Sequence, residues 1–215
     1  MFLYELMIDE GPHDPHIFKA VFMAGSPGAG KTTIANKLFS GSGLKFVDLD
    51  RFEALYRARG HKVEYHTDTS YDHFWKLSQK QKKNYVDGRL GMIIDGTAKD
   101  LDRIITQKHI LEKMGYSTAM IFVNTDLQTA IQRVDHRFKT QGRPVAHDRV
   151  TKSWNMSQQN MGKLQEHFGA SFFIVDNSKP NIDVGHIAKK VDHFLRTPPS
   201  DYRAKEWLQQ QQATR

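Results

Sequence analysis

Apolar residues occur along this chain in five short runs that alternate with longer stretches of mixed polarity. The runs lie at residues 17–25, 44–49, 91–95, 117–123 and 170–175, and they are rich in branched and aromatic side chains. Strands that are apolar on both faces are typical of parallel sheets covered by helices on each side. The pattern therefore predicts an α/β fold, a three-layer sandwich with a mostly parallel five-stranded sheet.

The stretches between these runs carry apolar residues at helical spacing. In three of them the apolar side chains share one face, and we interpret these faces as core packing. Gly115 is placed to cap the first of these helices, and a last helix is expected over residues 187–195. The three stripes consist of Leu101, Ile104, Ile105, Lys108, Leu111 and Met114; of Leu127, Ala130, Ile131, Val134 and Phe138; and of Val150, Trp154, Met161, Leu164 and Phe168.

The chain shows no repeat and no internal linker, which favours a single main domain. We predict an N-terminal extension at residues 1–17, an α/β domain at 18–196 and a C-terminal tail at 197–215. Two prolines, Pro198 and Pro199, stop the helical pattern before the tail. Three apolar tail residues are candidates for docking on the domain or on a partner, namely Tyr202, Trp207 and Leu208.

Composition narrows the chemistry. The 215 residues include no cysteine, which excludes disulfides, thiolate zinc sites and a cysteine nucleophile. The first residues lack the basic and apolar regions of a secretory signal, and no apolar run approaches about 18 residues, so we expect a cytoplasmic protein without membrane association. The net charge of +7 fits a nucleic-acid ligand or any other phosphate ligand.

A glycine-rich motif follows the first predicted strand and precedes an amphipathic helix. Residues 25–32, GSPGAGKT, match the phosphate-binding pattern G-x-x-x-x-G-K-[ST] in the context that the motif requires. Lys31 would bridge the β- and γ-phosphates of a nucleotide, and Thr32 would offer its hydroxyl to Mg²⁺. The candidate ATP-binding residues are Gly25, Ser26, Pro27, Gly28, Ala29, Gly30, Lys31, Thr32 and Thr33.

The ends of other strands separate the classes of P-loop protein. Asp95 ends an apolar strand and is a candidate for the magnesium site, but Gly96 follows it where motor ATPases place a glutamate. The best match to a guanine-binding box, at residues 124–126, lacks its lysine. Both features argue against a motor or a GTPase switch and leave kinases that phosphorylate a small acceptor.

Such a kinase needs a carboxylate near the acceptor hydroxyl and arginines around the transferred phosphoryl group. Asp48 and Asp50 follow the second strand at a spacing of two, which would point both toward the same edge, and either could be the general base or a surface acid. Residues 131–152 are predicted to form a lid with six basic and two acidic residues. Arg133 and Arg137 share a helix face there and Arg143 lies in a turn, although a solvated basic face is the alternative.

Several segments between residues 18 and 180 resemble the zeta-toxin-like P-loop kinases, namely GSPGAGKTT, VDLDRF, IIDGTAKDLDR, MGYSTAMIFV, AIQR and GRPV. The resemblance implies ATP and Mg²⁺ as cofactors, with Lys31 at the phosphates, Asp50 as general base, and Arg133 and Arg143 clamping the transferred phosphate. It places Asp95 near the acceptor or metal, where zeta toxins have a glutamate. Arg137 joins the ATP-binding candidates, and Thr97 joins the acceptor-binding ones.

The sequence leaves open which molecule accepts the phosphoryl group. The best-known family members phosphorylate UDP-N-acetylglucosamine, so we expect a small nucleotide-like or sugar-nucleotide acceptor and, for a toxin, a neutralising protein partner. Polynucleotide 5′-hydroxyl kinases are the alternative, with Asp48 and Arg51 as base and clamp. A basic track would then lead to the site through Lys76, Lys80, Lys82, Lys83 and Arg89, though these fit the faces of one helix better. A non-catalytic nucleotide-binding regulator is the third hypothesis.

Overall fold

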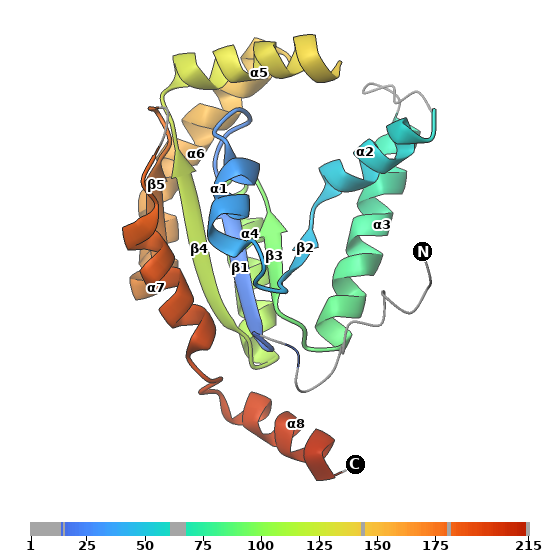
Figure 1. Ribbon diagram of the computed structural model, residues 1–215, viewed down its shortest axis with the longest axis vertical. Helices are drawn as coiled ribbons and strands as arrows, with labels where there is room; N and C mark the ends of the chain where they lie inside the picture. Colours follow the sequence, from blue (N-terminus) through green and yellow to red (C-terminus); the bar gives the residue numbers. More distant parts are fainter. Residues whose placement is uncertain (1–13, 15, 61–67, 143–144, 180–181, 214–215) are drawn as a thin grey trace.

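The predicted parallel sheet is confirmed. A computed structural model describes residues 14, 16–60, 68–142, 145–179 and 182–213, and Figure 1 shows the sheet at its centre. The strands are β1 (Lys19–Ala24), β2 (Lys45–Val47), β3 (Met92–Asp95), β4 (Ser117–Asn124) and β5 (Phe172–Asp176). They run parallel in the order β2-β3-β1-β4-β5, so β1 lies in the middle.

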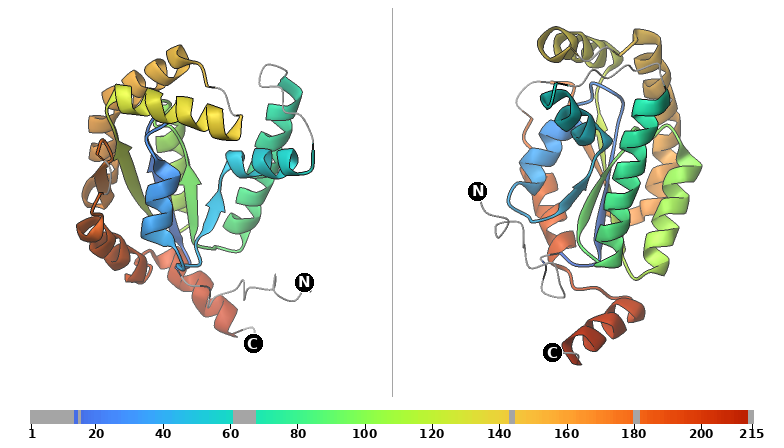
Figure 2. Two further views of the ribbon diagram at one scale, coloured as in Figure 1. Left: turned by 45° about the horizontal axis from the view of Figure 1, so that its top comes forward. Right: turned by 90° about the vertical axis from the view of Figure 1, so that its right-hand side faces the viewer.

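Helices cover both faces of this sheet, as the sequence predicts (Figure 2). Helices α1 (Lys31–Phe39) and α7 (Gly185–Arg196) pack on one face, while α4 (Leu101–Lys113) and α6 (His147–Phe168) pack on the other. The connections contain α2 (Leu49–Ala58), α3 (Asp68–Asp87), α5 (Leu127–Gln141) and the short 3₁₀ helix η2 (Gly169–Ser171). None of the helices in the described parts of the chain is long and apolar enough to cross a membrane.

Residues of β1 alternate between the two cores that this arrangement creates. Phe22 faces the core of α4 and α6, whereas Val21 and Met23 face that of α1 and α7. Lys19 is an exception among these apolar side chains, because it is only 2% exposed and its ammonium lies 4.8 Å from the ring centroid of Phe194. Burial lowers the pKa of Lys19 to about 8.

The C-terminal residues form a further helix, α8 (Tyr202–Ala213), which packs against the domain. The Trp207 ring meets Phe18 edge-on at a centroid distance of 5.5 Å, and Leu208 packs on the same core. Tyr202, by contrast, is 71% exposed. Two of the three candidate residues of the tail thus contact the domain.

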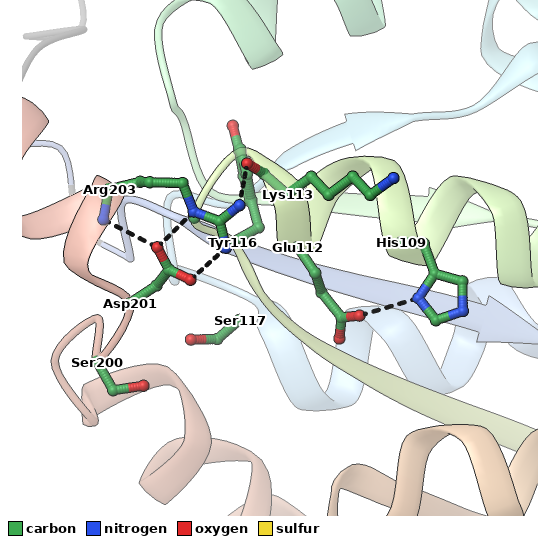
Figure 3. Close-up of a pocket in the computed structure, with 9 residues that line it drawn as sticks. His109, Glu112, Lys113, Tyr116, Ser117, Ser200, Asp201 and Arg203 are labelled. Atoms are coloured by element: carbon green, nitrogen blue, oxygen red, sulfur yellow. Dashed lines mark hydrogen bonds and ion pairs between the residues drawn. The ribbon is translucent and has the colours of Figure 1, made fainter.

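A polar cavity of about 600 Å³ lies where α8 begins, between the end of α4 and the start of β4 (Figure 3). Four of its charged or titratable side chains form two pairs, Arg203 with Asp201 and His109 with Glu112. Arg203 binds the Asp201 carboxylate and donates to the Lys113 carbonyl at 2.7 Å, and Glu112 lies 3.5 Å from His109. This cavity is at the starting edge of the parallel strands, opposite the edge where the glycine-rich loop leaves β1.

One residue of the predicted apolar stripes does not join the core. Phe138 near the end of α5 is 53% exposed, whereas Ala130 and Val134 on the same helix are buried with Val150 of α6. The contact of α5 with α6 thus involves the first part of α5, and the helix continues beyond it. Phe138 lies in a helix, as its spacing predicts, but it is not buried. Helical spacing indicates which residues share a face and does not indicate how far along the helix the contact with α6 extends.

Candidate active site

The glycine-rich motif forms the turn between β1 and α1, as predicted. Gly28 and Gly30 have positive φ angles of 81° and 89°, in the left-handed region that favours glycine. A Cβ atom at Gly28 would overlap the Ala130 carbonyl, and one at Gly30 would overlap the Asn177 amide. Both glycines are therefore required by conformation and by close approach.

This turn leads directly into the N-terminus of α1, where backbone N–H groups are free to bind an anion. The first turn of α1 contains no acidic residue that would oppose such binding. The Lys31 ammonium folds back over the loop and donates to the carbonyls of Gly25 (3.0 Å) and Ser26 (3.3 Å). Lys31 is half-buried and Thr32 beside it is exposed, so both are placed at the mouth of the loop.

Two side chains from distant segments brace the loop. The Asn177 amide, just after β5, donates to the Ala29 carbonyl at 2.6 Å, and Arg133 of α5 approaches the carbonyls of Gly28 and Ala29 at 3.5 and 3.4 Å. Arg133 is one of the predicted site residues, whereas Asn177 is not among them. The only signal for Asn177 was an amide directly after the last strand, which equally suits an ordinary polar turn.

The orientation of α5 brings its arginines to the loop. Asp126 caps the helix by accepting from the Thr129 backbone N–H at 2.7 Å, and this hydrogen bond holds the pKa of Asp126 below its usual range. Arg137 follows Arg133 by one helical turn, and its buried Nε has no hydrogen-bond partner among the described residues. Arg143 lies outside the described residues, so its predicted role and the lid stay predictions.

Two carboxylates, those of Asp95 and Asp48, lie at the carboxyl ends of β3 and β2, on the side of the P-loop away from α5. Asp95 is the last residue of β3 and pairs with Met23 of β1, while Val47 of β2 is opposite Ile94. Asp48 follows Val47 and therefore comes level with Asp95 at the same edge of the sheet. Asp95 is exposed and Asp48 is half-buried.

The argument that paired Asp48 with Asp50 was wrong in one respect. Strand β2 ends at Val47 and α2 begins at Leu49, so Asp50 lies in a helix and the spacing of two does not make their side chains parallel. The side chain of Asp50 lies outside the described part of the structure. Arg51 is exposed on the same helix.

The oxygen donors near the loop fit a magnesium ion. Mg²⁺ prefers oxygen ligands and is usually held by one or two protein groups together with substrate phosphates and water. The Thr32 hydroxyl in the first turn of α1 and the Asp95 carboxylate at the end of β3 are donors of this kind. Within the described ranges, no group of three or more His, Cys, Asp or Glu side chains forms a metal cage.

Comparisons with known proteins agree with this geometry. The family model described as Zeta toxin matches residues 10–183. A structure of the PezAT chromosomal toxin–antitoxin system of Streptococcus pneumoniae is similar to this one, with a TM-score of 0.58 and 20% identity over 98% of this chain and 90% of that chain. The AvrRxo1-ORF1:-ORF2 structure with ATP gives a TM-score of 0.57 and 12% identity, over 97% and 84% of the two chains.

The Pnkp1/Rnl/Hen1 RNA repair complex also contains this fold, with a TM-score of 0.54 and 18% identity over 67% of this chain and 45% of that chain. No curated protein matches the sequence. At these identities the solved structures establish the shared fold, whereas the family model spans most of the chain. The P-loop, the acids that flank it and the match over residues 10–183 lead to one assignment: this chain belongs to the zeta toxin family.

Proposed function

We propose that the protein is an ATP-dependent kinase that transfers the γ-phosphoryl group to a hydroxyl of a small nucleotide-like or sugar-nucleotide acceptor. The observation that carries this proposal is the braced P-loop, which has carboxylates on its β3 side and arginines on its α5 side. Family membership and the ATP-containing structure of similar fold support it.

Each group has a defined task in this reaction. Backbone N–H groups of residues 25–33 and the Lys31 ammonium hold the phosphates. Bound Mg²⁺ would neutralise phosphate charge, with Thr32 and Asp95 as its protein ligands. Asp50 accepts the proton of the acceptor hydroxyl as its oxygen attacks the γ-phosphorus, and the bond to the β–γ bridging oxygen breaks to release ADP. Arg133, Arg137 and Arg143 stabilise the charge on the transferred group.

Polynucleotide 5′-hydroxyl kinase activity is the second candidate, favoured by the fold shared with the RNA repair complex. In that reading Asp48 is the base and Arg51 holds the acceptor phosphate. Four residues of the proposed basic track lie on helix α3, where Lys76, Lys80 and Lys83 are exposed and Lys82 is half-buried, with a pKa lowered to about 8 by burial and by Arg103. The same helix buries Phe74, so the exposed lysines also fit the outer face of a helix that packs on the domain. A non-catalytic nucleotide-binding regulator stays the third hypothesis.

We also propose a neutralising protein partner. The support is the similar fold found in the PezAT toxin–antitoxin system. Co-expression with proteins encoded beside this chain, followed by purification through a tag on the chain, would test it. Absence of any stoichiometric companion would contradict the proposal.

Transfer from γ-labelled ATP to pooled sugar nucleotides, nucleotides and 5′-hydroxyl oligonucleotides tests the function. We expect label on the sugar-nucleotide or nucleotide pool, and labelling of the oligonucleotides alone would favour the second candidate. Lys31→Ala should abolish transfer, whereas Lys189→Ala, an exposed lysine on α7, should leave it unchanged. Full activity in Lys31→Ala would refute the P-loop assignment.

A further inference from the structure

The central sheet has two edges, and they differ in how far they are protected from pairing with another strand. Strand β2 at one edge is three residues long, whereas β5 at the other edge has five residues (Figure 1). Natural proteins usually shorten, charge, bulge or cover an edge strand, because its unpaired backbone groups would otherwise pair with a second strand. Residues 172–175 of β5, FFIV, carry no charge and no proline, and their register with β4 is continuous. Strand β5 therefore lacks most of these protections.

The backbone of β5 points alternately toward β4 and away from it. The Asn177 N–H, directly after the strand, donates to the Asn124 carbonyl of β4 at 2.7 Å. The direction alternates with a period of two, so Val175 and Phe173 also direct their N–H and C=O groups toward β4. The residues between them direct these groups outward, to the free edge.

Ile174 is the residue at the middle of this free edge. Its backbone N–H and C=O have no hydrogen-bond partner in the described part of the chain, and the same holds for those of Asp176. At the start of the strand, the Phe172 N–H donates to the Gly169 carbonyl of η2, which leaves the Phe172 carbonyl facing outward. A row of donors and acceptors is thus available along β5.

The Ile174 side chain is uncovered at the same place. It is 42% exposed, whereas its neighbours Phe173 and Val175 are 7% and 3% exposed in the core of α1 and α7. A single exposed apolar side chain needs no explanation on a protein surface. At Ile174, however, it coincides with unpaired backbone, and a β-branched side chain at this position suits a strand that is paired on both sides.

The free groups of β5 match their own copies. When two β5 strands are placed antiparallel about a twofold axis at Ile174, the two Ile174 residues face each other and exchange both backbone hydrogen bonds. Asp176 then comes opposite Phe172 of the second copy, and its N–H meets the outward carbonyl of that residue. A surface that pairs with itself about a twofold axis is the usual arrangement in homodimers.

The charges at the ends of β5 also suit this arrangement. The carboxylates of the two Asp176 residues lie at opposite ends of the pair, so they do not oppose each other. Counted five residues from the axis in each direction, Lys179 of one copy is opposite Gly169 of the other. Gly169 caps the C-terminal end of α6, where the helix carries partial negative charge and Glu166 is exposed, and Lys179 is exposed as well. The register thus brings opposite charges together.

We propose that two copies of this chain associate through β5 and join their sheets as an antiparallel pair of edge strands. The occupant of the edge is a second copy because the free groups of Ile174 and the charges at the ends of β5 are met in the symmetric register. The inference does not rest on kinase activity, so its failure would leave the proposed function untouched.

Sedimentation velocity on the full chain, from about 5 to about 200 µM, tests the association. A ladder of a few hydrogen bonds has a modest net gain that must exceed the cost of association, so we expect a dissociation constant between about 1 and about 100 µM. The sedimentation coefficient should rise with concentration from that of one chain to that of two. A single-chain species across the whole range would refute the proposal.

Substitutions at Ile174 locate the interface. Ile174→Lys places two charges at the twofold axis and should weaken association at least about 30-fold, with little change in melting temperature because the side chain is exposed. Ile174→Val keeps the strand pairing and should stay within about threefold of wild type. Ile110→Lys, at a side chain 54% exposed on α4, is the matched control and should not alter association. Unchanged association in Ile174→Lys would overturn the proposal.

Amide hydrogen exchange distinguishes strand pairing from any other mode of association. The Ile174 amide should exchange at least about 10-fold more slowly when the dimer predominates than in dilute protein, whereas the Val175 amide, which faces β4, should be protected at both concentrations. A dimer without added protection at Ile174 would rule out β5 as its interface. A chain that stays monomeric but loses a co-purified protein through Ile174→Lys would assign the edge to that other protein and refute the pairing of two copies.

Discussion

Asn177 should control nucleotide affinity although we assign it no contact with phosphate. Its amide donates to the Ala29 carbonyl at 2.6 Å, while its backbone N–H donates to Asn124 at 2.7 Å and its carbonyl accepts from Thr125 at 3.2 Å. Asn177→Ala removes only the first of these bonds. The substitution therefore releases the P-loop from β5 without removing the backbone bonds that hold the end of that strand.

The size of the effect follows from burial. Ala29 is fully buried, so its carbonyl loses its short hydrogen bond and keeps only the longer approach of Arg133 at 3.4 Å. An orphaned buried acceptor costs about 1 to 3 kcal/mol, and we expect a loss of about 2 kcal/mol in the free energy of unfolding. If about 1.4 kcal/mol of this appears as looser loop conformations that do not bind, nucleotide affinity falls about 10-fold.

Urea unfolding gives the first quantity, and titration with a fluorescent ATP analogue gives the second. Asn177→Asp tests the direction of the bond, because a carboxylate of the same shape cannot donate to Ala29 and adds negative charge beside the phosphate site; its loss of affinity should exceed that of Asn177→Ala. Asn155→Ala, an exposed amide on α6, is the control. Affinity within twofold of wild type in Asn177→Ala would refute the brace.

Three further expectations concern other parts of the molecule. Asp50→Asn should lower turnover at least about 10²-fold with nucleotide affinity kept, and a crippling Asp48→Asn beside a mild Asp50→Asn in the same assay would favour the polynucleotide kinase reading. The pKa of Lys19, lowered from 10.5 to about 8, means that the unfolded chain binds more protons between these values, so stability rises with pH there. Lys19→Met should raise stability at pH 7 by about 2 kcal/mol and reduce that rise in urea titrations across pH 7 to 10; lower stability would contradict it. Trp207→Ala should cost about 2 to 3 kcal/mol of unfolding free energy and expose α8 to proteolysis, and wild-type resistance would show that α8 is held by other contacts.

The parts of the fold that were predictable are those with a local signal. The five strands have apolar runs, and the P-loop has a spacing that only a few conformations satisfy. Asn177 lacked such a signal, and for the tail the sequence marked Trp207 and Leu208 as docking candidates without identifying the surface that they contact, because these contacts join residues far apart in sequence. Asn177 reaches Ala29 across 148 positions, and Trp207 reaches Phe18 near the other end of the chain. Polar turns and short amphipathic segments occur in many settings, so neither partner could be identified beforehand.

The two acids after β2 show a different limit. A run of alternating residues at 46–50 suits a strand, but it also suits a short strand followed at once by a helix, and three strand residues are too few to decide. The structure selects the second case because α2 starts at Leu49. Asp48 is thereby fixed at the edge of the sheet, whereas the position of Asp50 depends on the first turn of α2.

The strand order places the acidic groups and the basic or amide groups of the candidate site on opposite sides of the P-loop. Because β1 lies between β3 and β4, the P-loop has the carboxylates of Asp95 and Asp48 on one side. On the other side lie Arg133 and Asn177, carried by segments that follow β4 and β5. Acidic groups on one side of the loop and basic groups on the other suit the proposed transfer to a hydroxyl, since the two sets of charges do not neutralise each other. Substitutions on the acidic side should therefore change turnover, and substitutions on the β5 side should change nucleotide affinity.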